Sequence, residues 1–254
     1  MAYFRMPHLL MNDYPARFPC KVLSDDRFWA LIPCAGSGSR AGADGPKQYQ
    51  LLAGQPMVLH TLTAFAGVTR IANTAIVVAP GETFFDTHVA GCCVAACGAA
   101  TRAGSVLNGL QFLLQQGADT RDWVLVHDAA RCLITTIQIN TLIDACATDE
   151  VGGLLAIKLP DTLKLEVAGR VASTLERSDK WLAQTPQMFR LGMLIDALKQ
   201  AGNQVTDEAS AIEALGLHPL LVLGSAQNFK VTCPEDFALA EAVLKMRFDD
   251  RQIT

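Results

Sequence analysis

Residues 28–48 constrain the fold of this chain more than any other stretch. The apolar run Phe28–Pro33 has the length and composition of a short buried strand. A loop of small residues, Ala35 to Gly38, follows directly and lets the backbone approach a ligand closely. Two cations, Arg40 and Lys47, come next in the same short segment. This combination favours a loop that binds a polyphosphate at the end of a strand.

The rest of the chain alternates strand-like and helix-like segments, apart from a segment at 94–104 that carries no clear pattern. Strands are expected at 74–79, 123–127, 153–159, 220–223 and 228–231. Helices are expected at 56–65, 105–116, 136–147, 191–201, 207–215 (with Thr206 as its cap) and 234–246. This alternation predicts an α/β fold: a mostly parallel, Rossmann-like sheet with helices on both faces.

Ligands of such sheets bind beyond the carboxyl ends of the strands. The loop with Arg40 and Lys47 follows the first strand, and Asp128 and Arg131 follow the strand at 123–127. Lys230 lies near the end of the last expected strand. We therefore expect these charges to share one edge of the sheet.

One segment, about 160–184, breaks the alternation. It alternates weakly and has a turn signal at Gly169, so it predicts an extended β-arm rather than another βα unit. An arm of this kind often serves a neighbouring subunit. Residues 28–249 otherwise predict a single domain. Residues 1–27 lack the pattern of a signal peptide, and we expect them to form a loosely ordered extension.

Composition narrows the class of protein. Half of the 254 residues are apolar and the net charge is −4, which argues against a nucleic-acid partner because such proteins present a basic face. No apolar run is long enough to span a membrane. The eight cysteines include no CxxC pair and predict reduced thiols in a cytoplasmic protein. His88 lies near Cys92, Cys93 and Cys97, but their spacing matches no standard zinc site.

A rival interpretation comes from the glycines of the first loop. Gly36-x-Gly38-x-x-Ala41 satisfies the literal form of the dinucleotide-binding fingerprint. The fingerprint also needs an acidic residue about 20 residues on, at the end of the second strand. That strand ends far later, and Gly45-Pro46 interrupts the helix that should follow the glycines. A nicotinamide-dependent oxidoreductase therefore ranks below a polyphosphate site. A Walker A loop is excluded because no Gly-Lys-Ser/Thr follows.

Asp128 has two readings. It can be a turn or capping residue, or it can be a Mg²⁺ ligand that faces the phosphates, since Mg²⁺ prefers hard oxygen donors. Its place after a buried strand, near a phosphate-type loop, favours the magnesium ligand. The neighbouring His127 is expected to be a packed strand residue rather than a catalyst.

Taken together and in order, the motifs resemble those of the 2-C-methyl-D-erythritol 4-phosphate cytidylyltransferases of the non-mevalonate isoprenoid pathway, which are nucleotidyltransferases with a glycosyltransferase-A-like fold. The resemblance covers about residues 28 to 247. The matching stretches are Ile32–Arg40, Pro46–Tyr49, Val126–Arg131, Asp161–Lys164, Ala183–Gln187, Thr206–Ser210 and Asn228–Thr232.

The resemblance implies an enzyme that transfers CMP from CTP to methylerythritol phosphate with Mg²⁺, as a homodimer that exchanges its arms. The implied catalytic residues are Arg40, Lys47, Arg177 and Lys230. The implied nucleotide-binding residues are Pro33, Ala35, Gly36, Gly38, Gly98, Ser105 and Asp128, and Asp128 would also hold the metal. The implied residues for the second substrate are Arg131, Thr162, Arg177, Thr185 and Lys230, with Arg177 reaching into the partner's site.

The chain departs from the family pattern at two positions. Ala99 stands where the family has a second glycine, which affects the expected fit to cytosine, and Glu176 stands where an aspartate is common. Two alternative functions stay open. One is a cytidylyltransferase for another polyol phosphate, such as ribitol 5-phosphate, and the other is a non-catalytic nucleotide-binding module.

Overall fold

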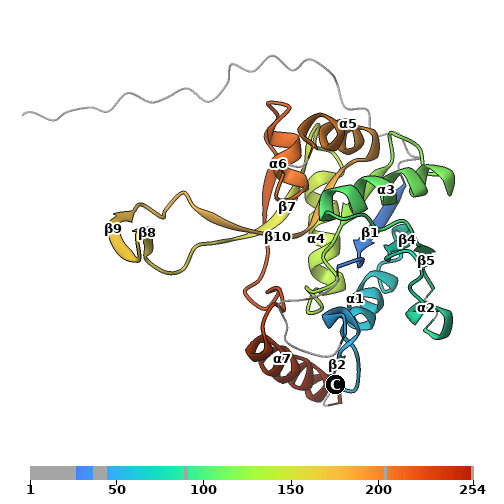
Figure 1. Cartoon of the computed structure of the whole chain (residues 1–254), viewed down its shortest axis with the longest axis horizontal. Coiled ribbons are helices and arrows are strands. Elements are labelled where there is room, and N and C mark those ends of the chain that lie inside the picture. Colours follow the sequence, from blue (N-terminus) through green and yellow to red (C-terminus); the bar gives the residue numbers. More distant parts are fainter. Residues whose placement is uncertain (1–26, 37–44, 89–90, 203–204, 253–254) are drawn as a thin grey trace, which may run out of the picture.

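The computed structural model describes residues 27–36, 45–88, 91–202 and 205–252 (Figure 1). Its strands are β1 (Phe28–Pro33), β2 (Leu51–Leu52), β3 (Gln55–Pro56), β4 (Ile71–Val77), β5 (Cys93–Ala95), β6 (Trp123–Val126), β7 (Gly152–Lys158), β8 (Leu163–Val167), β9 (Arg170–Leu175), β10 (Trp181–Arg190) and β11 (Leu220–Leu223). Its helices are the 3₁₀ turn η1 (Lys47–Tyr49), α1 (Met57–Ala66), α2 (Phe84–Thr87), α3 (Arg102–Gln115), α4 (Thr136–Cys146), α5 (Leu191–Ala201), α6 (Glu208–Glu213) and α7 (Pro234–Gln252).

Seven strands form the central sheet in the order β11-β7-β10-β6-β1-β4-β5. All neighbours pair in parallel except β10, which runs antiparallel to both β6 and β7. The predicted mostly parallel sheet is therefore confirmed. The buried strand β1 lies between β4 and β6, so the loop that follows it opens near the middle of the sheet, at its carboxyl edge.

Helices cover both faces of this sheet (Figure 1). On one face, α3, α5 and α6 bury a cluster that includes Leu110, Leu113 and Leu194. On the other face, α1 and α4 bury a second cluster that includes Phe65 and Leu142. A third, smaller cluster lies under α7. Burial of this much apolar surface on both faces explains why β1 and β6 are continuous apolar runs.

The strand β10 was missed by the sequence prediction. It contains Pro186 and several polar residues, and proline is normally confined to edge strands or bulges. Its pairing with β7 is in fact irregular between Ala183 and Gln187, where the proline lies. Because β10 enters the sheet at Trp181, the last residues of the predicted arm belong to the sheet.

The remainder of the predicted arm forms the antiparallel hairpin β8–β9, which projects from the body of the protein (Figure 1). It turns at Ala168-Gly169, where both residues have positive φ, in agreement with the predicted turn at Gly169. Leu163, Leu165 and Leu175 lie on one face of this hairpin, because Leu163 pairs with Leu175 and Leu165 lies two residues on from Leu163. The register shifts between Leu165 and Glu166, so that Val171 pairs with Glu166.

Two local predictions were wrong. Residues 228–231 form no strand: Val231 donates one backbone hydrogen bond to Ala130 (2.8 Å), and the segment connects β11 to α7. The cap of α6 is Asp207 instead of Thr206. The Asp207 carboxylate accepts from the backbone of Ser210, and the Ser210 hydroxyl approaches the Asp207 backbone in return.

Candidate active site

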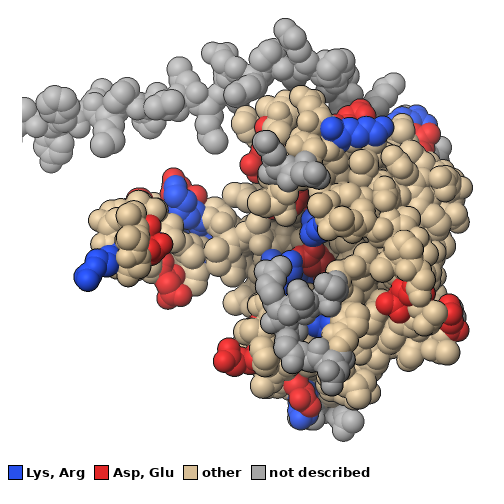
Figure 2. All heavy atoms as spheres, in the orientation of Figure 1, with Lys and Arg blue, Asp and Glu red and all other residues tan. Residues whose placement is uncertain are grey.

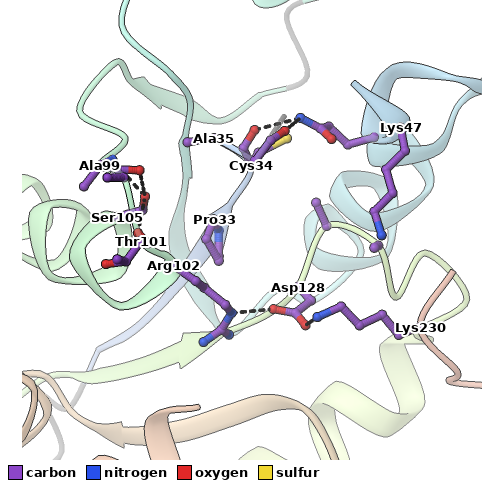
Figure 3. Close-up of a pocket in the computed structure, with 15 residues that line it drawn as sticks. Pro33, Cys34, Ala35, Lys47, Ala99, Thr101, Arg102, Ser105, Asp128 and Lys230 are labelled. Atoms are coloured by element: carbon purple, nitrogen blue, oxygen red, sulfur yellow. Dashed lines mark hydrogen bonds and ion pairs between the residues drawn. The ribbon is translucent and has the colours of Figure 1, made fainter. Parts of the chain in front are cut away.

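A cavity of about 520 Å³ opens at the carboxyl ends of β1 and β6 (Figure 3). Its floor comes from these two strands, one wall from the start of α3, and the opposite wall from η1 and the segment before α7. The lining residues are Pro33, Cys34, Ala35, Gly36, Lys47, Gln48, Ala99, Ala100, Thr101, Arg102, Ser105, Asp128, Ala129, Ala130 and Lys230. The cavity thus joins several predicted nucleotide-binding residues to Lys47 and Lys230.

The loop after β1 forms part of this cavity, as predicted, through Pro33, Ala35 and Gly36. The buried side chain of Gln48 holds this loop, because its amide donates to the carbonyl oxygens of Cys34 (3.1 Å) and Gly36 (2.9 Å). The predicted residues Gly38 and Arg40 lie outside the described residues.

Lys47 extends from η1 into the cavity and donates from Nζ to the carbonyl oxygen of Val231 (2.8 Å). This contact joins residues from distant parts of the chain and places the ammonium group beside the segment that carries Lys230. A half-buried cation at the rim of a cavity suits a polyanionic ligand.

Asp128 lies between two cations (Figure 3). Its Oδ1 accepts from Nε of Arg102 (2.9 Å), and its Oδ2 accepts from Nζ of Lys230 (2.7 Å). Burial alone would raise the pKa of Asp128, but the charges of Arg102 and Lys230 outweigh it and hold the pKa well below its ordinary value. Asp128 is therefore a carboxylate at neutral pH.

Arg102 connects this pair to a fourth charge, on Glu208. Both terminal nitrogens of Arg102 donate to the fully buried carboxylate of Glu208 (2.7 and 3.0 Å). Neither Arg102 nor Glu208 was assigned a role from the sequence. The only sequence signal was the presence of Glu208 in the matched stretch Thr206–Ser210.

Two of the predicted nucleotide-binding residues, Gly98 and Ser105, shape the loop at the start of α3. Ser105 is buried, and its hydroxyl accepts from the backbone of Ala99 (2.9 Å) and donates to the carbonyl oxygen of Thr101 (3.0 Å). Gly98 packs closely, since a Cβ at this position would lie 2.3 Å from the Cβ of Ala35. Gly98 thus brings the Ala99 loop against the first loop, and Ala99 itself lines the cavity.

Arg131 and Thr185 lie beside Asp128. Arg131 donates to the carbonyl oxygens of Asn228 (2.8 Å) and Ala183 (3.2 Å), while its buried Nε has no acceptor in the described part of the chain. Thr185 is buried, and its hydroxyl accepts from the backbone of Asp128 (3.0 Å) and contacts Nδ1 of His127 (3.1 Å). The role of Thr185 at the second substrate stays a prediction, and its observed position is behind the Asp128 backbone.

His127 is fully buried at the end of β6, as expected for a packed residue. Its Nε2 contacts the carbonyl oxygen of Arg131 (3.1 Å). Burial lowers the pKa of His127 to about 4, so the ring is neutral at pH 7. It therefore braces the turn after β6.

Two predicted residues lie apart from the cavity. Thr162 and Arg177 belong to the connections between the hairpin and the sheet, and the guanidinium of Arg177 bonds the carbonyl oxygen of Pro160. Both are exposed, and neither lines the cavity. Figure 2 shows charged side chains in the central hollow and a separate group on the projecting hairpin.

The carboxylates of the cavity bear on the predicted Mg²⁺ site. Within the ranges that the structure describes, no three His, Cys, Asp or Glu side chains gather into a metal site. Asp128 is one carboxylate facing the cavity, and Mg²⁺ is commonly bound by one or two carboxylates together with substrate phosphates. The residues present therefore fit a metal that arrives with a nucleotide rather than one held by the protein alone.

The arrangement is suited to charge neutralisation. Cations from η1, α3 and the segment before α7 surround a cavity whose first loop offers close backbone approach. The described residues include no His–carboxylate pair in the cavity that could act as a general base. None of the described helices has both the length and the apolar character needed to cross a membrane.

Comparison with known proteins gives a consistent result. The sequence model of the family "IspD: 2-C-methyl-D-erythritol 4-phosphate cytidylyltransferase" matches residues 28–246. A 2-C-methyl-D-erythritol 4-phosphate cytidylyltransferase of Nitrosomonas eutropha is 52% identical over 228 residues, which cover 87% of this chain and 98% of the relative. A bifunctional enzyme IspD/IspF of Albidiferax ferrireducens is 69% identical over 240 residues, and these cover 93% of this chain but 57% of the relative.

Solved structures agree. A crystal structure of 4-diphosphocytidyl-2C-methyl-D-erythritol synthase superposes with a TM-score of 0.77 at 39% identity, covering 86% of this chain and 98% of the other. The 2-C-methyl-D-erythritol 4-phosphate cytidylyltransferase of Francisella tularensis superposes with a TM-score of 0.73 at 32% identity, covering 85% and 98%.

Proposed function

The chain belongs to the family of 2-C-methyl-D-erythritol 4-phosphate cytidylyltransferases, and on this premise we propose that its cavity transfers CMP from CTP to 2-C-methyl-D-erythritol 4-phosphate. The reaction is a step of isoprenoid precursor biosynthesis. The observation that carries the proposal is the gathering of Lys47, Lys230 and Asp128 beside the small-residue loop, at the carboxyl edge of the sheet.

The chemistry is an in-line displacement at phosphorus. An oxygen of the acceptor phosphate attacks the α-phosphorus of CTP and forms a new P–O bond. The bond from the α-phosphorus to the oxygen that bridges to the β-phosphorus breaks, and pyrophosphate leaves with the electron pair. The acceptor is already anionic near neutral pH, so the protein needs no general base, in keeping with the neutral, buried His127.

The residues of the chain then position the substrates and neutralise charge. Lys47, together with Arg40 from the sequence prediction, binds the triphosphate and stabilises charge that builds at the α-phosphate. Lys230, which lines the cavity, and Arg131, in the turn after β6, bind the phosphate of the acceptor. Asp128 would hold Mg²⁺, which would supply further neutralisation of the triphosphate.

We also propose that the protein works as a cytoplasmic homodimer. The hairpin exposes an apolar face that includes Leu165 and Leu175, and exposed apolar patches of this kind mark protein contacts. In the dimer, Arg177 and Thr162 of one subunit complete the acceptor site of the other. The described cysteines are free thiols, which suits a reducing compartment.

A pyrophosphate-release assay tests the proposal. CTP, UTP and ATP are each combined with methylerythritol phosphate and with ribitol 5-phosphate. We expect rapid release only with CTP and methylerythritol phosphate. Release only with ribitol 5-phosphate would reassign the acceptor, and tight CTP binding without release from any pair would indicate a non-catalytic nucleotide-binding module.

A further inference from the structure

A line of four charges of alternating sign runs from the body of the protein into the cavity. Glu208, the first residue of α6, pairs with Arg102 at the start of α3; Arg102 pairs with Asp128 after β6. Asp128 in turn pairs with Lys230 before α7. The line ends on a cation that the proposed function places at the acceptor phosphate.

Glu208, at the buried end of this line of charges, is held in place by hydrogen bonds around the start of α6. Asp207 caps α6, and the side chain of Gln187 on β10 accepts from the backbone of Ala209 (2.7 Å) and donates to the Asp207 carboxylate (2.8 Å). Glu208 is therefore fixed between two residues that are both anchored to the central sheet. Its carboxylate has no solvent contact.

Burying a carboxylate costs several kcal/mol of desolvation, and a paired cation offsets that cost only with good geometry. Burial indeed raises the pKa of Glu208, and Arg102 partly opposes the shift. An apolar residue would fill the same place at the start of α6 with less cost. The charge of Glu208 is thus better explained by its effect on the orientation of Arg102.

Glu208 controls which nitrogens of Arg102 face the cavity. The bidentate pair uses one N–H of each terminal nitrogen and fixes the plane of the guanidinium, so that Nε is directed to Asp128. The side chain of Arg102 lines the cavity and is 29% exposed. Without Glu208, the terminal nitrogens of Arg102 would be free to bind a triphosphate. A guanidinium binds phosphate oxygens as readily as it binds carboxylate oxygens.

We propose that Glu208 is a positioning residue for the transfer reaction: it holds Arg102 so that this guanidinium orients Asp128 and, through it, Lys230, instead of binding the triphosphate itself. The inference rests on the proposed function, since it concerns the same cavity and the same reaction. It differs from a purely structural role, in which Glu208 would only stabilise the start of α6.

The test compares Glu208→Gln, which keeps the shape and removes the charge, with the wild type. Glu213→Gln makes the same change at an exposed position of the same helix and serves as the matched control. Three quantities are measured: kcat for pyrophosphate release from CTP and methylerythritol phosphate, the Kd of CTP with Mg²⁺ by calorimetry, and the Tm. Both glutamate variants are also made in an Arg102→Ala background.

We expect Glu208→Gln to lower kcat by about tenfold or more, the usual size of an effect transmitted through a ligand's partner. CTP should bind within threefold of the wild-type Kd or more tightly, and Glu213→Gln should behave as wild type. In the Arg102→Ala background, Glu208→Gln should change kcat by less than about threefold, because coupled residues do not add. Glu208→Asp retains the charge and should lie between Glu208→Gln and the wild type.

The inference is overturned by a kcat of Glu208→Gln within threefold of wild type, by a tenfold weaker CTP affinity, or by an undiminished loss in the Arg102→Ala background. If Glu208→Gln fails to fold, the same comparison with Glu208→Asp decides. A wild-type protein that releases no pyrophosphate overturns the proposed function instead, and the inference falls with it. An active wild type beside an equally active Glu208→Gln overturns the inference alone.

Discussion

The cavity and the β8–β9 hairpin differ in whether contacts within the same chain hold their side chains in place. In the cavity, Asp128, Arg102 and Glu208 are partnered by charges of the same chain and largely removed from water. In the hairpin, every residue of β9 is exposed, including Val171 at 66%. The cavity therefore needs no second subunit to hold its charges in place. The hairpin carries exposed apolar side chains, and its connections to the sheet carry the predicted substrate residues Thr162 and Arg177. In the proposed dimer the partner subunit covers the first and uses the second.

This difference predicts two kinds of mutational effect. Substitutions in the cavity should change the chemistry and leave association intact, whereas substitutions on the hairpin should act through the partner subunit.

The largest expected effect is that of Lys47→Ala. Removing a cation that acts on the transition state costs on the order of 3 kcal/mol, so kcat should fall about a hundredfold or more. The Tm should change little, because Lys47 is half-buried at the rim of the cavity and its Nζ donates to a backbone carbonyl oxygen, that of Val231. Steady-state pyrophosphate release and a thermal melt measure both quantities.

Lys199→Ala is the control for Lys47→Ala, since Lys199 is an exposed lysine on α5 outside the cavity. Its kcat should equal that of the wild type. Near-normal turnover of Lys47→Ala would show that this lysine does not act in the reaction. It would also contradict the interpretation of the cavity as the site of CMP transfer.

A mixing experiment addresses the hairpin. Lys47→Ala disables the cavity of a chain, and Arg177→Ala disables its arm. If the arm serves the partner, mixed dimers contain one intact site made from the cavity of one chain and the arm of the other. Random mixing should then restore about a quarter of the wild-type activity, because half of the dimers are mixed and each rebuilds one of two sites.

The mixing experiment would give a different result if the arm did not serve the partner subunit. If Arg177 acts within its own chain, the mixture will show only the summed residual activities of the two variants. Denaturing and refolding the two proteins together, or co-expressing them, gives the exchange of subunits that the measurement needs.

Association itself should respond to the apolar face of the hairpin. Leu175→Glu places a charge on the face formed with Leu163 and Leu165, so the dimer should weaken and sediment as monomer at micromolar concentration. Thr174→Glu puts the same charge on the opposite face of the same strand and is the matched control. A Leu175→Glu protein that sediments like the wild type would show that this face lies outside the dimer contact.

Much of the fold could be predicted because its signals are local. The apolar runs of β1 and β6 and the turn at Gly169 each depend on a few neighbouring residues. Residues 228–231 have the composition of a strand, but in the described part of the chain they pair with no neighbouring strand. In contrast, β10 contains a proline and lies inside the sheet.

The site was predictable only in part, for a similar reason. Lys47 and Asp128 follow recognisable strands or loops, so their residue types and positions indicated their place. The pair of Arg102 and Glu208 joins two helices far apart in the sequence, and each residue alone resembles an ordinary charge in the first turn of a helix. The packing of α5 against both α3 and α6 brings them together.

A last expected effect concerns stability, and it arises in the buried body of the protein rather than in the exposed arm. Burial lowers the pKa of His127 to about 4 in the folded protein, below its ordinary value of 6.5. The unfolded chain therefore binds the proton first as the pH falls. The contribution of His127 to the free energy of unfolding is fully present above pH 6.5 and is lost as the pH falls to about 4, by about 3 kcal/mol.

Urea unfolding between pH 7 and pH 4 measures this loss. His127→Gln cannot take up the proton, so its free energy of unfolding should start lower at pH 7, because two buried hydrogen bonds are altered, and should then fall less steeply. His218→Gln, at an exposed position, should follow the wild-type profile. If His127→Gln and the wild type lose stability in parallel, the acid sensitivity of the protein arises elsewhere than at the buried end of β6.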